Sequence, residues 1–355
     1  MINVNIADLV RPNIRELEPY SCARSEFKGE AQIFLDANES PYGVYNRYPD
    51  PLQEQVKEKI AKVKGVRPSQ IMLGNGSDEP IDLIYRIFCR PGVDNVVAMC
   101  PTYGMYKVAA DINDVEYREA MLEEETFALL PERMLALADA NTKAMWVCSP
   151  NNPTGNLIAP EAIETLLDKF GGILVVDEAY IDFSSKPSWL KRLDEFPRLI
   201  VLQTFSKAWG LAGVRCGMAF ASEEIISIFN KVKYPYNISV LTQKAVSDAI
   251  DNPLDTVGHA GFLVQERKRL EECLSRLPIV EHVYPSDANF LLVKVKDADA
   301  TYAALLGKGM VTRNRNKVKL CHGCLRITVG NDNENDAIIT DLLVLGPEDH
   351  FWVGL

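Results

Sequence analysis

The chain has 355 residues, of which 47% are apolar and 25% are charged. This ordinary globular composition excludes a disordered, collagen-like or simple coiled-coil protein. The 49 acidic residues outnumber the 38 basic ones, and the net charge of −11 disfavours general binding to nucleic acid or to anionic membranes. The N-terminus shows no secretory signal, no apolar run approaches the roughly 20 residues of a membrane span, and the Cys residues are scattered. We therefore expect a cytoplasmic protein with reduced thiols.

Cys321 and Cys324, in CHGC, have the spacing of a redox or metal motif. A zinc site would need a second such pair or nearby histidines, and His322 is the only histidine close in sequence. We expect two ordinary thiols in a turn, and no metal.

Short apolar runs followed by polar, Gly- or Pro-containing clusters recur through the first two thirds of the chain. They lie at 71–74, 96–99, 144–148, 173–176 and 199–205. Runs of this kind are typical of strands buried on both faces, and helical patterns at 79–90 and 160–170 separate some of them. The alternation predicts an α/β fold with a mostly parallel central sheet flanked by helices. All five polar clusters would lie at the carboxyl ends of the strands, where ligands bind in such sheets. Each cluster could alternatively be no more than a turn.

The last third has a different pattern, with a long helix at about 257–276, strands at 289–295 and 325–330, and a final helix at about 333–345. This order predicts a smaller α+β domain. We expect three parts: an N-terminal segment, 1–35, that covers the active site and packs on the small domain; a large domain, 36–240; and a small domain, 241–355.

Lys207 follows the apolar run at 199–205 directly after Ser206. A lysine buried near a cofactor could have a depressed pKa and form a Schiff base. Ser206 and Arg215, eight residues after Lys207, offer a hydroxyl and a guanidinium that suit a phosphate. The alternative is a strand-end lysine that caps a helix.

Asp177 ends the run at 173–176, and a carboxylate at a buried strand end needs a cationic or hydrogen-bonding partner. A protonated pyridine nitrogen would serve, with Tyr180 three residues on facing the same site. Asn152, in the rigid loop SPNNPTG, could present its amide to a phenolate oxygen. Asp177 could equally be a helix cap, and the NNP loop alone favours a stiff turn.

The turn GNGSDEP at 74–80 opens a helix, where the backbone N–H groups of Gly76, Ser77 and Asp78 could hold a phosphate. It matches neither nucleotide fingerprint, and capping by Ser77 or Asp78 is the alternative. Tyr103, in PTYGMY, could stack on a flat ring or be a core aromatic.

In this order the clusters resemble a fold-type I aminotransferase that uses pyridoxal 5′-phosphate (PLP). The resemblance extends over nearly the whole chain. Within that superfamily, RPNIRELEPY at 11–20, LDANESPYG at 35–43, RYPDP at 47–51 and CLRITVG at 324–330 are similar to hallmarks of the histidinol-phosphate aminotransferase family.

The resemblance implies the role of each cofactor-site residue. Lys207 would bond to the cofactor and move a proton during catalysis, and Asp177 would pair with the pyridinium nitrogen. Asn152 and Tyr180 would bind the ring oxygen, and Tyr103 would stack on the ring. The cofactor phosphate would be held by Gly76, Ser77, Asp78, Ser206 and Arg215, and by Tyr48 from a partner subunit, which implies a homodimer.

The resemblance also implies substrates, L-histidinol phosphate and glutamate or 2-oxoglutarate, in histidine biosynthesis. Arg326 would bind the carboxylate of glutamate, and Arg313 and Tyr20 the substrate phosphate, with Asn38 and Tyr236 as further contacts. Arg313 could instead belong to a solvated basic loop with Arg315 and Lys317. An aromatic amino acid aminotransferase, a threonine-phosphate decarboxylase and an aminotransferase-like regulatory binding domain are the alternatives.

Overall fold

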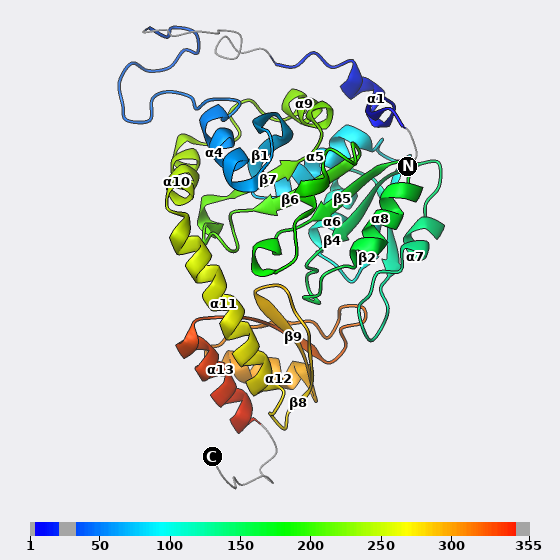
Figure 1. Cartoon of the computed structure of the whole chain (residues 1–355), viewed down its shortest axis with the longest axis vertical. Coiled ribbons are helices and arrows are strands. Elements are labelled where there is room, and N and C mark those ends of the chain that lie inside the picture. The colour runs from blue at the N-terminus through cyan, green and yellow to red at the C-terminus, as the bar shows by residue number, and fades with distance from the viewer. Residues whose placement is uncertain (1–3, 21–32, 346–355) are drawn as a thin grey trace.

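The computed structural model describes residues 4–20 and 33–345. Its central feature is a seven-stranded sheet with the strand order β1-β7-β6-β5-β4-β2-β3 (Figure 1). The strands are β1 (Ile71–Asn75), β2 (Asn95–Cys100), β3 (Glu116–Met121), β4 (Thr142–Cys148), β5 (Ile173–Asp177), β6 (Leu199–Thr204) and β7 (Cys216–Phe220). β7 is antiparallel to β1 and β6, and the other neighbouring pairs are parallel. The predicted α/β fold with a mostly parallel sheet is confirmed.

The five predicted strands are all present, and the sheet gains two more. β3 lies at the edge of the sheet with the sequence EYREAM and exposes much of its surface, so it lacks the apolar run of a buried strand. β7 follows β6 after a short irregular connection. Because a parallel neighbour needs a longer crossover, this connection gives an antiparallel strand.

Helices cover both faces of the sheet, so the large domain has three layers. One face packs against α4 (Glu54–Lys64), α7 (Pro131–Ala136), α8 (Pro160–Lys169) and α10 (Val240–Asp251). The other packs against α5 (Asp78–Phe88), α6 (Met105–Ile112) and α9 (Glu223–Val232). Four short 3₁₀ turns complete this region: η1 (Pro68–Gln70), η2 (Ile181–Phe183), η3 (Trp189–Arg192) and η4 (Ala212–Val214).

The sequence of α5 explains why its N-terminus lies at the carboxyl end of the sheet. Ile81, Ile84 and Phe88 recur at helical spacing and are fully buried against the sheet. The helix begins after the glycine turn that follows β1, and it ends before Pro91. The first-turn amides therefore point toward the edge where the parallel strands end.

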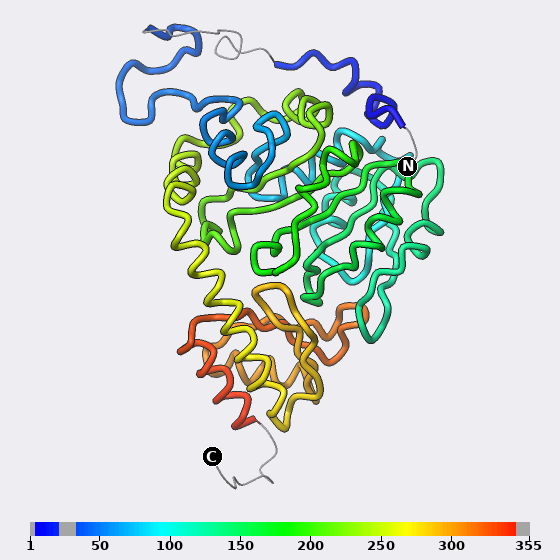
Figure 2. Tube along the Cα trace, viewed as in Figure 1, coloured from blue at the N-terminus to red at the C-terminus, as the bar shows by residue number. Residues whose placement is uncertain are grey.

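The smaller domain is a four-stranded antiparallel sheet, in the order β10-β11-β9-β8, covered by helices. Its elements are α11 (Pro253–Leu274), β8 (Val280–Tyr284), β9 (Phe290–Val295), α12 (Ala298–Gly307), β10 (Arg313–Asn314), β11 (Cys324–Thr328) and α13 (Asp332–Val344). Its core includes the fully buried Leu270, Leu291, Leu305, Leu325 and Leu342. Figure 2 shows α11 running from the side of the large domain down into this domain. α10, the first element of the predicted small domain, contacts α4 of the large domain as well as α11.

Of the predicted N-terminal segment, residues 4–20 lie on the large domain and not on the small one, and residues 21–32 are outside the described part of the chain. α1 (Ile6–Leu9) and α2 (Pro12–Arg15) bury Ile6 and Ile14 in the core shared by α5 and α9. The Arg11 amide donates to the Ile87 carbonyl at 2.9 Å. Ile6, Val10 and Ile14 therefore attach this part of the chain to the large domain. Within 4–20 and 33–345, no helix is both long and apolar enough to cross a membrane.

Candidate active site

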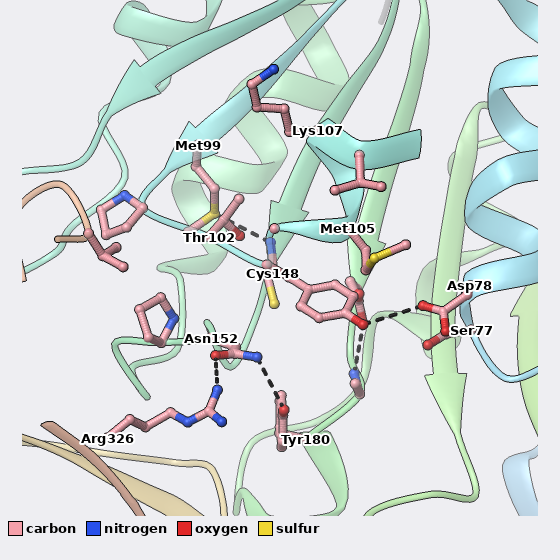
Figure 3. Close-up of a pocket in the computed structure, with 18 of the residues that line it drawn as sticks. Ser77, Asp78, Met99, Thr102, Met105, Lys107, Cys148, Asn152, Tyr180 and Arg326 are labelled. Carbon is pink, nitrogen blue, oxygen red and sulfur yellow. Dashed lines mark hydrogen bonds between the residues drawn. The ribbon is translucent and has the colours of Figure 1, made fainter. Parts of the chain in front are cut away.

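A cavity of about 840 Å³ lies between the carboxyl ends of the parallel strands and β10–β11 of the small domain. The convergence predicted from the sequence is confirmed, because all five polar clusters contribute to its wall. The predicted residues that line it are Ser77, Asp78, Tyr103, Asn152, Asp177, Tyr180, Ser206, Lys207, Arg215, Arg313 and Arg326. Figure 3 shows several of them pointing into the same space.

Asp177 ends β5 at the floor of the cavity and is only 3% exposed. Its Oδ2 accepts a 2.6 Å hydrogen bond from the Tyr106 hydroxyl, and its Oδ1 accepts one of 3.0 Å from the Ala179 amide. Burial raises the pKa of the Asp177 carboxyl, and these two donors act against that rise. A buried carboxylate with two donors still favours a cationic partner in the cavity.

Lys207 follows β6 and lines the cavity. Its Nζ lies 5.6 Å from the centre of the Tyr180 ring. Its pKa is lowered first by desolvation and next by the charge of Arg326, while Asp177 opposes the shift. A larger share of the amine is therefore neutral than for a solvated lysine, which suits a nucleophile or base.

Arg215 and the glycine turn form the wall next to α5. Arg215 adopts a left-handed backbone, with a φ of 58°, and its carbonyl accepts from the Gly76 amide at 3.0 Å. Its guanidinium lies 3.3 Å from the Asp78 carboxylate, which also accepts from the Tyr103 hydroxyl at 3.3 Å. Gly76 has a φ of 66°, which strains any other residue, and a Cβ there would displace this guanidinium. Ser77 makes no side-chain capping bond, and this leaves the first amides of α5 to an external anion.

A chain of hydrogen bonds joins the large domain to β11 across the cavity. The Arg326 guanidinium donates to Asn152 Oδ1 at 2.5 Å, and Asn152 Nδ2 donates to the Tyr180 hydroxyl at 3.4 Å (Figure 3). Burial raises the pKa of Tyr180 and lowers that of Arg326. The side chains of Arg326, Asn152 and Tyr180 therefore form one hydrogen-bonded group in the cavity wall.

Besides Gly76, whose turn borders the cavity, four of the predicted site residues lie outside the cavity wall: Tyr20, Asn38, Tyr48 and Tyr236. Tyr20 is 76% exposed, and Asn38 and Tyr48 belong to the extended segment from residue 33 to residue 50. Tyr48 stacks on Tyr236 with ring centres 4.5 Å apart. The chain by itself does not bring these residues to Lys207, and their predicted contacts stay predictions.

Two residues that sequence analysis did not assign also belong to the site. Tyr106 is fully buried and donates a hydrogen bond to Asp177. The sequence hinted at this role only through its position three residues after Tyr103. Arg315 lines the cavity beside Arg313 and Arg326, although its setting in a basic run suggested a solvated loop.

The two cysteines of CHGC are fully buried thiols. Burial raises the pKa of Cys321 to about 12 and that of Cys324 to about 11. Among the residues that the structure describes, no group of three or more His, Cys, Asp and Glu side chains is arranged to hold a metal ion.

Comparison with known proteins gives the family. A family model described as aminotransferase class I and II matches residues 30–342. The histidinol-phosphate aminotransferase of Parabacteroides distasonis is 54% identical over 336 residues, which cover 94% of this chain and 97% of that protein. The chain belongs to the histidinol-phosphate aminotransferase family. Enzymes of this family depend on PLP.

Two solved structures have the same fold as this aminotransferase. The histidinol-phosphate aminotransferase of Sinorhizobium meliloti, in complex with PLP, has a TM-score of 0.77 at 22% identity and covers 87% of this chain and 89% of its own. The L-threonine-O-3-phosphate decarboxylase of Porphyromonas gingivalis has a TM-score of 0.72 at 22% identity, covering 85% and 91%. The fold is therefore shared by enzymes of different activity, and the fold alone does not determine the substrate.

Proposed function

We propose that this chain transfers the amino group of L-histidinol phosphate to 2-oxoglutarate, which gives imidazole-acetol phosphate and L-glutamate in histidine biosynthesis. The observation that carries the proposal is one cavity that combines Lys207, the buried Asp177 and a set of guanidinium groups on the opposite wall. The 54% identity to a histidinol-phosphate aminotransferase supports this substrate over others that the fold accepts.

The donor set of the cavity fits PLP. Within residues 4–20 and 33–345 the buried Asp177 carboxylate forms no salt bridge, which suits a pyridinium nitrogen, and Tyr103 of the same cavity would stack on the ring. Asn152 and Tyr180 offer two polar groups to a ring oxygen. The phosphate would be held by the Ser77 and Asp78 amides at the start of α5 and by the side chains of Ser206 and Arg215, whereas the Gly76 amide, predicted to join them, donates to the Arg215 carbonyl. When bound, the cofactor supplies an electron sink that stabilises negative charge at the substrate Cα.

Lys207 is the group that we assign to proton transfer. Its lowered pKa favours the neutral amine, which would hold the cofactor and, when free, would accept the proton from the substrate Cα. Asp177 would keep the ring nitrogen protonated, and Tyr180 would orient the ring. Because each of these groups would act on a different atom, the reaction requires all three to be positioned together.

The substrate contacts follow from the guanidinium groups. Arg326, oriented by Asn152, would bind the carboxylate of glutamate with its planar fork, and Arg313 with Tyr20 would bind the substrate phosphate. Asn38 and Tyr236 are proposed as further contacts.

We infer a homodimer from the extended segment at residues 33–48. It leaves the body of the molecule (Figure 1) and carries Leu35, Tyr42 and Val44 with exposures of 91%, 84% and 88%. Apolar side chains gathered at such exposure favour a protein partner. A second copy would bury them and could bring Tyr48 to the cofactor phosphate of the neighbouring site.

The experiment that tests the substrate is a set of half-reactions. The purified holoenzyme is mixed with one amino donor at a time, and the loss of the near-visible cofactor absorbance is followed. L-Histidinol phosphate and L-glutamate should both convert the cofactor. Faster conversion by phenylalanine, or release of carbon dioxide from threonine phosphate, would assign the chain to one of the alternative enzymes.

A further inference from the structure

Three arginines of the small domain face the cavity: Arg313 in β10, Arg326 in β11, and Arg315 directly after β10. Arg313 of β10 lies directly opposite Arg326 of β11 in the antiparallel register. The Arg315 amide continues this ladder with a 2.9 Å bond to the Cys324 carbonyl. Because side chains alternate along a strand, Arg315 shares the face of Arg313. All three line the cavity.

The residues between and after these arginines are anchored on the other face. Asp299, in the first turn of α12, accepts from the Asn314 side chain at 2.6 Å and from the Asn316 side chain at 2.8 Å. The Asn316 side chain in turn accepts from the Gly323 amide at 2.9 Å. Arg315 lies between two fixed residues, so its backbone is held in place with the side chain toward the cavity.

The three guanidinium groups lack an acidic partner in the part of the chain that the structure describes, where none of them forms an ion pair. Like charges opposite each other in a sheet are destabilising. The Nε groups of Arg315 and Arg326 are also buried without a hydrogen-bond partner. Burial, and next the charges of Arg326 and Arg313, lower the pKa of Arg315 to about 10. A cluster with these properties is stabilised by a bound anion.

The two substrates present different anions to this cluster. A carboxylate carries one charge and matches one guanidinium fork, which Arg326 provides. A phosphate monoester carries about −1.5 to −2 charges at pH 7 and three acceptor oxygens, so it can engage a further arginine. Arg313 is exposed, whereas Arg315 is half-buried and has the unsatisfied donor.

We propose that Arg315 is a specificity-determining residue that binds the phosphate of the amino donor and contributes little to the binding of glutamate. The inference rests on the proposed function for the identity of the donor. It adds a third guanidinium to the substrate contacts and gives it a task that Arg326 does not share.

The test compares R315Q with the wild-type holoenzyme in separate half-reactions. Loss of a hydrogen bond to a charged group should lower the rate per unit concentration of L-histidinol phosphate about 10- to 100-fold. The corresponding rate with L-glutamate should stay within about twofold, as for a change away from the bound group. K317Q removes the same charge from an exposed position of the same loop, outside the cavity wall, and should leave both rates unchanged.

A binding measurement separates this inference from the proposed function. Inorganic phosphate and glutarate are titrated into each holoenzyme by calorimetry. R315Q should weaken phosphate binding and spare glutarate, with the larger loss at higher pH, where inorganic phosphate becomes dianionic. R315K, which keeps the charge but lacks the fork, should show an intermediate loss, and it carries the same comparison if R315Q does not fold.

Equal losses for both anions, or the same loss in K317Q, would overturn the assignment of Arg315. If the wild-type enzyme itself does not react with L-histidinol phosphate, the proposed function fails instead. The comparison of phosphate with glutarate still decides the role of Arg315 in that case.

Discussion

At the scale of single residues, the contact that most affects the chemistry is the one between Tyr106 and Asp177. The 2.6 Å hydrogen bond favours the ionised carboxylate at a site where burial favours the neutral one. Tyr106 touches no predicted substrate group, and so it acts by positioning Asp177 and keeping it charged.

The variant Y106F should therefore raise the pKa of Asp177 and lower kcat about 10-fold, because a hydrogen bond to a charged group is lost. The acid limb of the kcat profile should move to higher pH, since Asp177 is protonated more readily. Kinetic measurements across pH, with the cofactor absorbance as a check on loading, give the result.

Y85F is the matched control for this variant. Tyr85 is fully buried and stacks on the same Trp146 as Tyr106, but its hydroxyl bonds the Tyr106 carbonyl and not Asp177. An unshifted acid limb in Y106F, or an equal shift in Y85F, would show that the tyrosine has only a packing role.

Asp177 and Lys207 could be predicted from sequence because each directly follows an apolar run, and a strand end in a parallel sheet is a place for ligands. Tyr106 and Arg315 could not. Tyr106 meets Asp177 across 71 residues, and Arg315 depends on a register that basic composition does not reveal. Pairing between distant elements was the missing information.

At the scale of elements, the connection after β5 depends on a buried acid. Glu178 is 1% exposed and accepts from the Trp189 amide at 2.8 Å and from Gln203 Nε2 at 2.9 Å, which tie η3 and β6 to the strand that carries Asp177. Burial raises its pKa from 4.5 to about 7, despite these donors.

This pKa predicts a pH-dependent stability. The folded state binds the Glu178 proton more tightly than the unfolded state, so its contribution is complete below about pH 4.5 and is lost as the pH rises through about 7. The loss amounts to at most about 3 kcal/mol. E178Q mimics the protonated acid. Between roughly pH 5 and pH 7.5, its free energy of unfolding by urea should therefore fall less than that of the wild-type protein. The same pH slope in both proteins would refute the assignment.

Burial made most of the strands predictable, although β7, with the sequence CGMAF, is fully buried and was not predicted. Strands buried on both faces are continuous apolar runs, and these gave five of the seven strands. The edge strand β3 is half polar because one side meets solvent, and the packing site of α1 and α2 depended on which apolar surface was free. The periodicity of apolar residues along the sequence shows neither the edge position of β3 nor the surface on which α1 and α2 pack.

At the scale of the whole molecule, the charge of −11 contrasts with a site proposed to hold two phosphates and a carboxylate. In this proposal the anions would be attracted by local groups, the N-terminus of α5 and the arginines of the cavity wall, and not by a basic surface. Their position in one cavity allows both substrates to use the same Lys207.

The dimer inferred from the extended segment gives a prediction at this scale. V44D places a charge on a side chain that is 88% exposed in the single chain, and it should shift the protein from dimer to monomer and reduce activity by weakening cofactor retention. Size-exclusion chromatography with light scattering measures the change. V344D, at a position 68% exposed on α13 at the far end of the molecule, should stay dimeric. A monomeric wild-type protein would contradict the inference.

The measurement that tests the central claim most directly is turnover of the proposed substrate by the purified holoenzyme. L-Glutamate and imidazole-acetol phosphate are supplied together, and the 2-oxoglutarate that forms is measured. The account predicts sustained production that requires both compounds and stops in a Lys207→Ala variant. A folded, cofactor-loaded enzyme that forms no 2-oxoglutarate from this pair would contradict it.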